Sequence, residues 1–144
     1  DDKVKFTALK KDGDKVKKGE IIFRVEGEAI SILTAERTAL NYMQRLSAIS
    51  TRTNYYQSLV EGTNAKLLDT RKTTPTMRVL EKYAVKTGGG TNHRFGLYDM
   101  IMLKDNHIDF AGGITQAINK VRKYLSERSL NLKIEVEVRD FLEL

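Results

Sequence analysis

The chain has 144 residues, of which 40% are apolar and 31% charged, and it contains no cysteine. This composition is typical of a globular protein and excludes an intrinsically disordered chain, a disulfide framework, thiolate catalysis and cysteine-ligated metals. Lysine and arginine outnumber aspartate and glutamate by 25 to 19, a formal net charge of +6, which favours an anionic partner such as a nucleic acid, a membrane surface or a phosphorylated metabolite.

Residues 1–34 have the pattern of β-strands. Apolar and polar residues alternate over 4–8 and again over 23–25, as on half-buried strands, and Asp12-Gly13 is a strong turn pair. The segment 12–23 resembles the hairpin repeat of biotinyl and lipoyl carrier domains, but it lacks the setting of their modifiable lysine. We therefore interpret this region as a strand-rich scaffold.

Residues 34–62 are predicted to be helical, because tyrosine, leucine and methionine recur at helical spacing. Thr34 is a suitable N-cap, and Gly62 is suited to end the segment. The stretch 47–53 is rich in serine and threonine, so we expect two consecutive helices rather than one. The apolar stripe is interpreted as core packing.

Strands and helices alternate over residues 65–144. We expect strands at 65–69, 99–104 and 133–139, and helices at 76–87 and 114–124. On the helix 76–87, the residues predicted to share one face are Met77, Leu80, Tyr83 and Ala84. The glycines 88–90 are expected to end it. This order, with parallel crossovers, predicts an α/β sheet or barrel, and the periodicity does not separate the two.

Charged residues follow the predicted strands. Arg71 and Lys72 come after the first strand, Lys104 ends the second, and Glu135 and Glu137 share one face of the third. In parallel α/β folds the carboxyl ends of the strands line the active site, so we expect these side chains to form an anion pocket with an acidic side. Such carboxylates suit Mg²⁺ that is held mostly through a substrate's phosphates.

Six segments, in unbroken order, resemble the quinolinate phosphoribosyltransferase family; they are residues 35–41, 68–75, 82–85, 88–94, 96–99 and 104–108. The longest reads Leu-Asp-Thr-Arg-Lys-Thr-Thr-Pro. The resemblance implies an α/β protein with two parts. Residues 1–48 would be part of an N-terminal α+β domain of barrel-sandwich-like strand hairpins plus a helix, and 49–144 the first part of a (β/α) TIM-type barrel.

The family's activity is implied in the same way. It transfers the phosphoribosyl group of phosphoribosyl pyrophosphate to quinolinate, a pyridine dicarboxylate, in the presence of Mg²⁺. The reaction includes a decarboxylation, so that nicotinate mononucleotide, pyrophosphate and CO₂ are formed for NAD synthesis. A polar site that orients the ring and stabilises the departing pyrophosphate suffices, with no covalent nucleophile.

The resemblance also implies which residues bind quinolinate. Arg71, His93 and Arg94 match the positions that hold its two carboxylates, and Thr70 belongs to the same substrate-binding segment. Arg37 matches an arginine that reaches into the site of the neighbouring subunit. A homodimer, or a larger assembly built from dimers, is therefore expected.

Three further positions concern the phosphoribosyl group. Lys72 and Lys104 match lysines near the phosphates and the ribosyl carbon. Glu137, or Glu135 two residues before it, matches the glutamate that binds the ribose hydroxyls or metal-bound pyrophosphate. We therefore expect Lys72, Lys104 and Glu137 to be catalytic, and Glu137 to be the residue nearest any Mg²⁺.

Two alternatives remain at this stage. A nicotinate phosphoribosyltransferase-like enzyme would use a monocarboxylate, whereas two or more arginines at the carboxylate end favour a dicarboxylate. A basic nucleic-acid-binding module would interleave aromatic residues with its cations, and only Phe95 beside Arg94 does so. The two histidines, His93 and His107, lack a third metal ligand at matching spacing, so His107 is expected to form a structural hydrogen bond.

The ends of the chain suggest an internal fragment. It begins with Asp1 instead of methionine, and 141–144 has the pattern of a first helical turn. No apolar run approaches the roughly 18 residues that a spanning helix needs, and no signal-peptide pattern is present. The lack of cysteine fits a reducing compartment, so a cytoplasmic location is expected.

Overall fold

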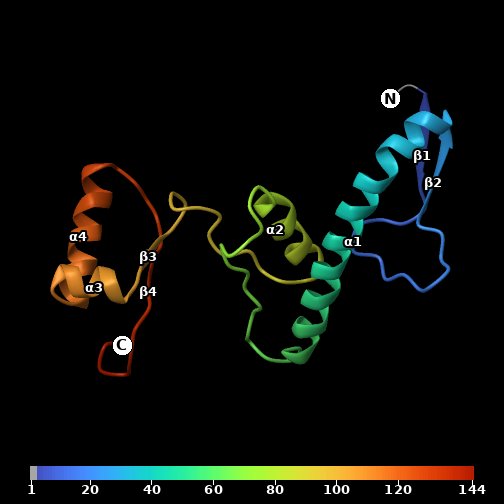
Figure 1. The fold of residues 1–144 in the computed structure, drawn as a ribbon. Coiled ribbons are helices and arrows are strands. Elements are labelled where there is room, and N and C mark those ends of the chain that lie inside the picture. Colours follow the sequence, from blue (N-terminus) through green and yellow to red (C-terminus); the bar gives the residue numbers. More distant parts are fainter. Residues whose placement is uncertain (1–2) are drawn as a thin grey trace. The chain divides into compact units, whose positions relative to one another are not determined.

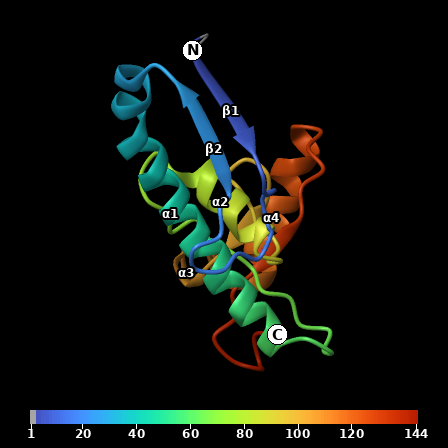
Figure 2. The ribbon, with the colours of Figure 1, turned by 90° about the vertical axis from the view of Figure 1, so that its right-hand side faces the viewer.

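An antiparallel hairpin begins the chain in the computed structural model, which describes residues 3–144 (Figures 1 and 2). Strand β1 (Val4–Ala8) pairs with β2 (Phe23–Gly27). The rings of Phe6 and Phe23 lie 5.2 Å apart on this hairpin. A turn at Asp12-Gly13 lies in the connection. The predicted β character is confirmed for these two strands. It is wrong for residues 29–34, because the following helix begins at Ala29 and Thr34, its predicted N-cap, lies inside it.

A single helix, α1 (Ala29–Leu59), follows the hairpin, so the prediction of two helices is wrong (Figure 2). Two of the residues that suggested a break, Ser50 and Thr53, lie where α1 packs against the end of α2. Thr53 is only 7% exposed, and Ser50 Oγ donates a hydrogen bond to the carbonyl oxygen of Ala84 at 2.8 Å. The helix therefore continues, with the hydroxyl of Ser50 bonded to α2 and Thr53 packed against Gly88.

Helix α2 (Arg78–Thr87) packs against α1 at very short range. A Cβ at Gly88 would lie 2.4 Å from the carbonyl oxygen of Ser50, so no larger residue fits there. Gly88 also ends α2, and its N–H donates to Ala84 O at 3.0 Å. The prediction that these glycines end the helix is confirmed, with close packing as the additional reason for glycine.

The predicted inner face of α2 is wrong in part. Its buried residues are Glu81, Lys82 and Ala84, whereas Tyr83 is 50% exposed and Leu80 36% exposed. Two charged residues occupy the inner face because each has a partner there. Hydrophobic periodicity does not detect such residues.

The strand expected at 65–69 is reduced to one parallel bridge between Leu68 and Thr91. The N–H of Thr91 donates to Leu67 O at 2.8 Å, and the N–H of Asp69 donates to Thr91 O at 3.2 Å. This bridge brings the chain segments on either side of α2 next to each other.

The later residues form a β–α–β arrangement. Strands β3 (Ile101–Leu103) and β4 (Ile134–Val136) are parallel, as predicted, but shorter than expected. Between them lie α3 (Asp105–Ala111) and α4 (Ile114–Glu127). The buried apolar residues here are Leu103, Ile108, Ala117 and Leu125.

Helix α3 was not expected from the sequence. Its polar beginning, Asp105-Asn106-His107, has the composition of a loop, yet Ile108 is almost completely buried. Gly112 ends the helix in the left-handed conformation, with φ of 90°. One buried side chain and a glycine cap are therefore enough to define this short element.

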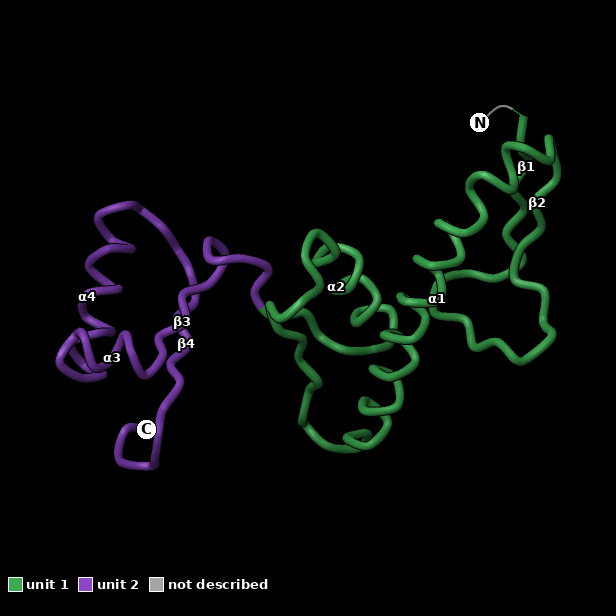
Figure 3. Tube along the Cα trace, viewed as in Figure 1, with its two compact units in different colours: residues 1–93 green, residues 94–144 purple. Residues whose placement is uncertain are grey.

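These elements form a mixed α/β fold with two small sheets, and the chain divides into two compact units, Asp1–His93 and Arg94–Leu144 (Figure 3). The first unit holds the hairpin, α1 and α2, and the second holds β3, β4, α3 and α4. Within residues 3–144, no helix has the length and apolar character needed to cross a membrane.

Candidate functional site

The segment Thr70–Thr74 follows the Leu68 bridge and carries Arg71 and Lys72. Its backbone is fixed locally: Thr70 Oγ1 accepts a hydrogen bond from the Lys72 N–H at 3.1 Å, and the Arg78 guanidinium donates to the carbonyl oxygen of Arg71 at 3.4 Å. These contacts leave the side chains of Arg71 and Lys72 for other partners.

Arg71 has an unsatisfied buried donor. Among residues 3–144, its Nε is the buried side-chain nitrogen or oxygen that lacks a hydrogen-bond partner. An unpaired buried donor on a charged group is costly, and such groups in folded proteins need an explanation. A bound anion would supply the missing acceptor, because a guanidinium matches a carboxylate or phosphate in two parallel hydrogen bonds.

Arg45 on α1 connects this segment to α2. Its guanidinium contacts Glu81 Oε1 at 2.5 Å and also hydrogen-bonds Thr74 Oγ1, while Glu81 Oε2 accepts the Thr74 N–H at 3.1 Å. Burial opposes ionisation of Glu81, but the hydrogen bonds from Arg45 and Thr74 outweigh it and lower the pKa of this carboxyl. The end of the segment is therefore held from both helices.

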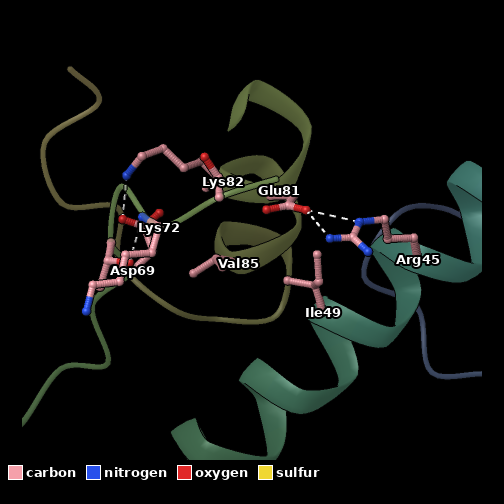
Figure 4. Close-up of a pocket in the computed structure, with 9 residues that line it drawn as sticks. Arg45, Ile49, Asp69, Lys72, Glu81, Lys82 and Val85 are labelled. Carbon is pink, nitrogen blue, oxygen red and sulfur yellow. Dashed lines mark hydrogen bonds and ion pairs between the residues drawn. The ribbon is translucent and has the colours of Figure 1, made fainter. Parts of the chain in front are cut away.

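A cavity of about 280 Å³ is lined by residues of this segment, of α1 and of α2 (Figure 4). Its lining includes Asp69, Thr70, Lys72, Glu81 and Lys82. The close-up shows Arg45 directed at Glu81 on one side, and Lys82 directed at Asp69 on the other. The two buried charged side chains of α2 thus hold Asp69 and Thr74, which lie on either side of Arg71 and Lys72 in the sequence.

His93 and Arg94 are consecutive residues with different surroundings. The N–H of His93 donates to Asp69 Oδ1 at 2.8 Å. In the second unit, the guanidinium of Arg94 contacts the sulfur of Met102 at 3.3 Å. The backbone just beyond it is fixed by Asp99, whose carboxylate accepts the N–H groups of residues 95 and 96.

Lys104 and Glu137 come together at the carboxyl ends of β3 and β4. Lys104 Nζ lies 2.5 Å from Glu137 Oε1, and both side chains are about half exposed. The register produces this contact, because the Glu137 N–H donates to Leu103 O at 2.9 Å and so extends the parallel pairing past β4. Glu135 lies on β4 itself, with an exposed side chain.

His107 fixes the backbone of Lys104. Its Nδ1 accepts the Lys104 N–H at 2.9 Å across the first turn of α3, so this ring nitrogen carries no proton. The expected structural hydrogen bond of His107 is confirmed. Within residues 3–144, no group of three or more histidines, aspartates and glutamates is arranged to hold a metal.

Arg37 lies on the exposed surface of α1. It has no ion-pair partner among residues 3–144. The first unit thus brings Thr70, Arg71 and Lys72 near His93, and the second unit brings Lys104 and Glu137 together. Arg37 belongs to the first unit, on α1.

Sequence reasoning missed the residues that support these side chains. Asp69 and Lys82 lie in segments that resemble the family, but neither was given a role, and Arg45 and Glu81 lie outside those segments. The one available signal was the position of Asp69, immediately before the Thr70–Thr74 segment.

Comparison with known proteins gives a consistent result along the whole chain. Residues 2–47 match the family model described as quinolinate phosphoribosyl transferase, N-terminal domain, and residues 49–144 match that of the C-terminal domain. A Bacillus subtilis protein named probable nicotinate-nucleotide pyrophosphorylase [carboxylating] is 47% identical over 99% of this chain and 49% of its own length.

Two further relatives extend the comparison. The Nicotiana tabacum protein named quinolinate phosphoribosyltransferase [decarboxylating] 1b is 49% identical over 92% of this chain and 37% of its own. The solved structure of the nicotinate-nucleotide pyrophosphorylase from Francisella tularensis is 47% identical with a TM-score of 0.93, over 99% of this chain and 50% of its own. The chain spans about half the length of these relatives, or less.

Proposed function

The chain belongs to the quinolinate phosphoribosyltransferase family, and on this premise we propose that the full-length protein transfers the phosphoribosyl group of phosphoribosyl pyrophosphate to quinolinate. The products are nicotinate mononucleotide, pyrophosphate and CO₂. The observation that carries the proposal is the buried, unpartnered Nε of Arg71 in the Thr70–Thr74 segment. A carboxylate of quinolinate would satisfy it.

Quinolinate is held by Arg71, His93 and Arg94 in this proposal. Two guanidinium groups supply two forks for the two carboxylates, and the imidazole adds a further hydrogen bond. A monocarboxylate such as nicotinate would leave one cation without its anion, which is the basis for discrimination between the two substrates.

The phosphoribosyl group is held by Lys72, Lys104 and Glu137, with Thr70 beside Lys72 and Glu135 as the alternative glutamate. The contact between Lys104 and Glu137 supports this assignment, because a lysine aimed at phosphates is kept extended by a neighbouring carboxylate. Glu137 can accept hydrogen bonds from ribose hydroxyls through its remaining lone pairs.

Mg²⁺ fits these residues as a substrate-held ion. It binds proteins through one or two carboxylates together with substrate phosphates, and does not need a cluster of protein ligands. Glu137, which directly follows β4, and Glu135 on β4 supply such carboxylates. When bound, Mg²⁺ would neutralise charge on pyrophosphate.

The reaction requires side chains that orient quinolinate and stabilise the negative charge of the departing pyrophosphate. The ring nitrogen of quinolinate bonds to the ribosyl carbon while the bond from that carbon to pyrophosphate breaks. Lys72 and Lys104 stabilise the leaving anion. The carboxylate next to the quaternised nitrogen then leaves as CO₂, the pyridinium ring holds the remaining electron pair, and that ring carbon takes up a proton.

We also propose the larger architecture. The hairpin and α1 belong to an N-terminal α+β domain of barrel-sandwich type, and residues 49–144 begin a (β/α) TIM-type barrel. The parallel β3 and β4, joined through α3 and α4, support this because such units build the barrel. The active enzyme is a homodimer, or a multiple of one, in which Arg37 completes the neighbouring site.

The test is substrate-dependent CO₂ release by the full-length protein. Quinolinate labelled at the carboxylate next to the ring nitrogen should give labelled CO₂ only when phosphoribosyl pyrophosphate and Mg²⁺ are both added. Turnover of nicotinate, with no CO₂ from quinolinate, would indicate the monocarboxylate enzyme instead. Binding of DNA with neither activity would indicate a nucleic-acid-binding module.

A further inference from the structure

Asp69 and Lys82 form an ion pair that is almost completely buried. Lys82 Nζ lies 2.5 Å from Asp69 Oδ1, and the exposed fractions of the two side chains are 3% and 6% (Figure 4). Removing two charges from water is expensive, and an apolar pair of similar volume often gives equal or greater stability. The pair therefore calls for an explanation other than stability.

Its hydrogen bonds are directed at the main chain of His93. Asp69 Oδ1 accepts the His93 N–H at 2.8 Å, and Lys82 Nζ donates to the His93 carbonyl oxygen at 3.1 Å. Both backbone polar groups of one proposed quinolinate-binding residue are thus held by the two members of the pair. An apolar pair could not provide either bond.

Asn92 extends this arrangement. In the amide orientation that satisfies its hydrogen bonds, its nitrogen donates to Asp69 Oδ2 and to the Lys82 carbonyl oxygen, each at 2.9 Å. Asp69 thereby uses both carboxylate oxygens on the segment that contains residues 92 and 93. This one carboxylate thus contacts two consecutive residues of the segment, in addition to the bond from Lys82 to His93.

The same aspartate lies at the start of the other binding segment. Asp69 immediately precedes Thr70–Thr74, which carries Arg71, and its own N–H donates to Thr91 O at 3.2 Å. One residue therefore joins the two segments through both its backbone and its side chain. Lys82 connects this junction to α2.

We propose that Asp69 and Lys82 are positioning residues that set the separation between Arg71 and His93, and so determine the affinity for quinolinate. The proposal rests on the function proposed above. Neither residue needs to touch the substrate, because a displacement of about 1 Å in a binding segment is enough to cost orders of magnitude in activity.

If the proposal is correct, variants of the pair change thermal stability and quinolinate affinity independently, and the experiment measures both. In the full-length enzyme, Lys82→Met leaves a buried unpaired carboxylate and is expected to be strongly destabilised. The double variant Asp69→Asn/Lys82→Met removes both charges. It should recover much of the thermal stability, while the His93 carbonyl remains without its donor.

The expected kinetic result is specific to one substrate. The double variant should show a KM for quinolinate raised by about tenfold or more, with the KM for phosphoribosyl pyrophosphate changed by less than about twofold. Leu125→Ala on α4 is the control, because it creates a cavity in the core of the second unit, whereas both segments belong to the first. It should lower the melting temperature and leave both KM values unchanged.

The outcomes separate the two proposals. A folded double variant with the wild-type KM for quinolinate would overturn the positioning role. If the double variant does not fold, Lys82→Arg, which keeps the charge but alters its geometry, replaces it. A wild-type KM for quinolinate in Lys82→Arg would then overturn the positioning role. A wild-type enzyme that forms no nicotinate mononucleotide refutes the proposed function instead. Direct calorimetry with quinolinate then reports whether the segments bind it at all.

Discussion

The ammonium group of Lys104 contacts the carboxylate of Glu137 at 2.5 Å, across 33 positions of sequence. The contact follows from the parallel pairing of β3 with β4, which brings the residues just after the two strands to the same edge. Both side chains remain about half exposed, so the pair is accessible to a ligand. An anion that binds here would contact a Lys104 side chain that Glu137 already holds in an extended conformation.

We expect Lys104→Ala to lower kcat much more than it weakens quinolinate binding. Its position at a strand end beside Glu137 suits stabilisation of the departing pyrophosphate, and interactions made mainly in the transition state appear in kcat. Steady-state kinetics on the full-length enzyme measure the split. A raised KM for quinolinate with kcat unchanged would contradict this role.

Arg71→Ala should abolish detectable quinolinate binding while the protein remains folded. A hydrogen bond to a charged group contributes about 1.5–3 kcal/mol, and Arg71 can form two to one carboxylate. Calorimetric titration measures the affinity, and circular dichroism checks the fold. Lys86→Ala, an exposed cation on α2, is the matched control. Equal affinities in both variants would remove Arg71 from the site.

His107 offers a test of how Lys104 is positioned. His107→Leu removes the acceptor of the Lys104 N–H, and kcat should fall by about threefold to tenfold, because a lost hydrogen bond costs about 1 kcal/mol. His107→Asn places an amide oxygen close to the former Nδ1 and should retain most of the activity. Equal losses in the two variants would mean that the ring itself, and not the acceptor, is required.

Sequence periodicity predicts the regular parts of this fold. The hairpin and the β3–β4 pair have the expected alternating or continuous apolar patterns, and both pairings occur. The undivided helix α1 could not be predicted, because Ser50 and Thr53 resemble helix breakers until the bond from Ser50 to α2 and the burial of Thr53 are known. A local sequence pattern does not contain that tertiary contact.

In the candidate site too, some residues were named from the sequence and others were found only in the structure. Arg71 and Lys104 were identified by resemblance and by their places after predicted strands. Asp69, Lys82 and Glu81 were not, because a buried charge looks like a solvated one until its partner is located. The residues proposed to contact ligands could thus be named from the sequence, whereas those that hold their segments in place required the structure.

Glu81 should make stability depend on pH. Its pKa is lowered in the fold, because the hydrogen bonds from Arg45 and Thr74 outweigh the opposing effect of burial. A lowered pKa means that the stabilisation is complete above the unfolded pKa and is lost as the pH falls through the folded one. Glu81→Gln should cost about 1–3 kcal/mol at neutral pH.

The difference between wild type and Glu81→Gln should therefore shrink in acid. Melting temperatures of the two proteins, compared at neutral pH and below the ordinary carboxyl pKa of 4.5, measure it. Glu26→Gln, at an exposed position on β2, is the control. A difference that stays constant over this range would show that Glu81 contributes through its shape and not through its charge.

The last prediction concerns Arg37, which lies on the exposed surface of α1. If Arg37 completes the neighbouring subunit's anion pocket, a two-fold dimer exchanges one such arginine in each direction. Arg37→Ala and Lys104→Ala enzymes should each be inactive. A mixture of the two should regain activity, because a hybrid dimer contains one site with both residues intact and one with neither.

The recovered activity has an expected size. With random equal mixing about half of the dimers are hybrids, and each has one working site of two, so about a quarter of wild-type activity should return. The measurement is turnover after subunit exchange, with exchange verified by two different affinity tags. The Arg37→Ala/Lys104→Ala double variant mixed with Lys104→Ala is the control, because no dimer in it contains Lys104. Absence of recovery after verified exchange would mean that Arg37 acts within its own chain.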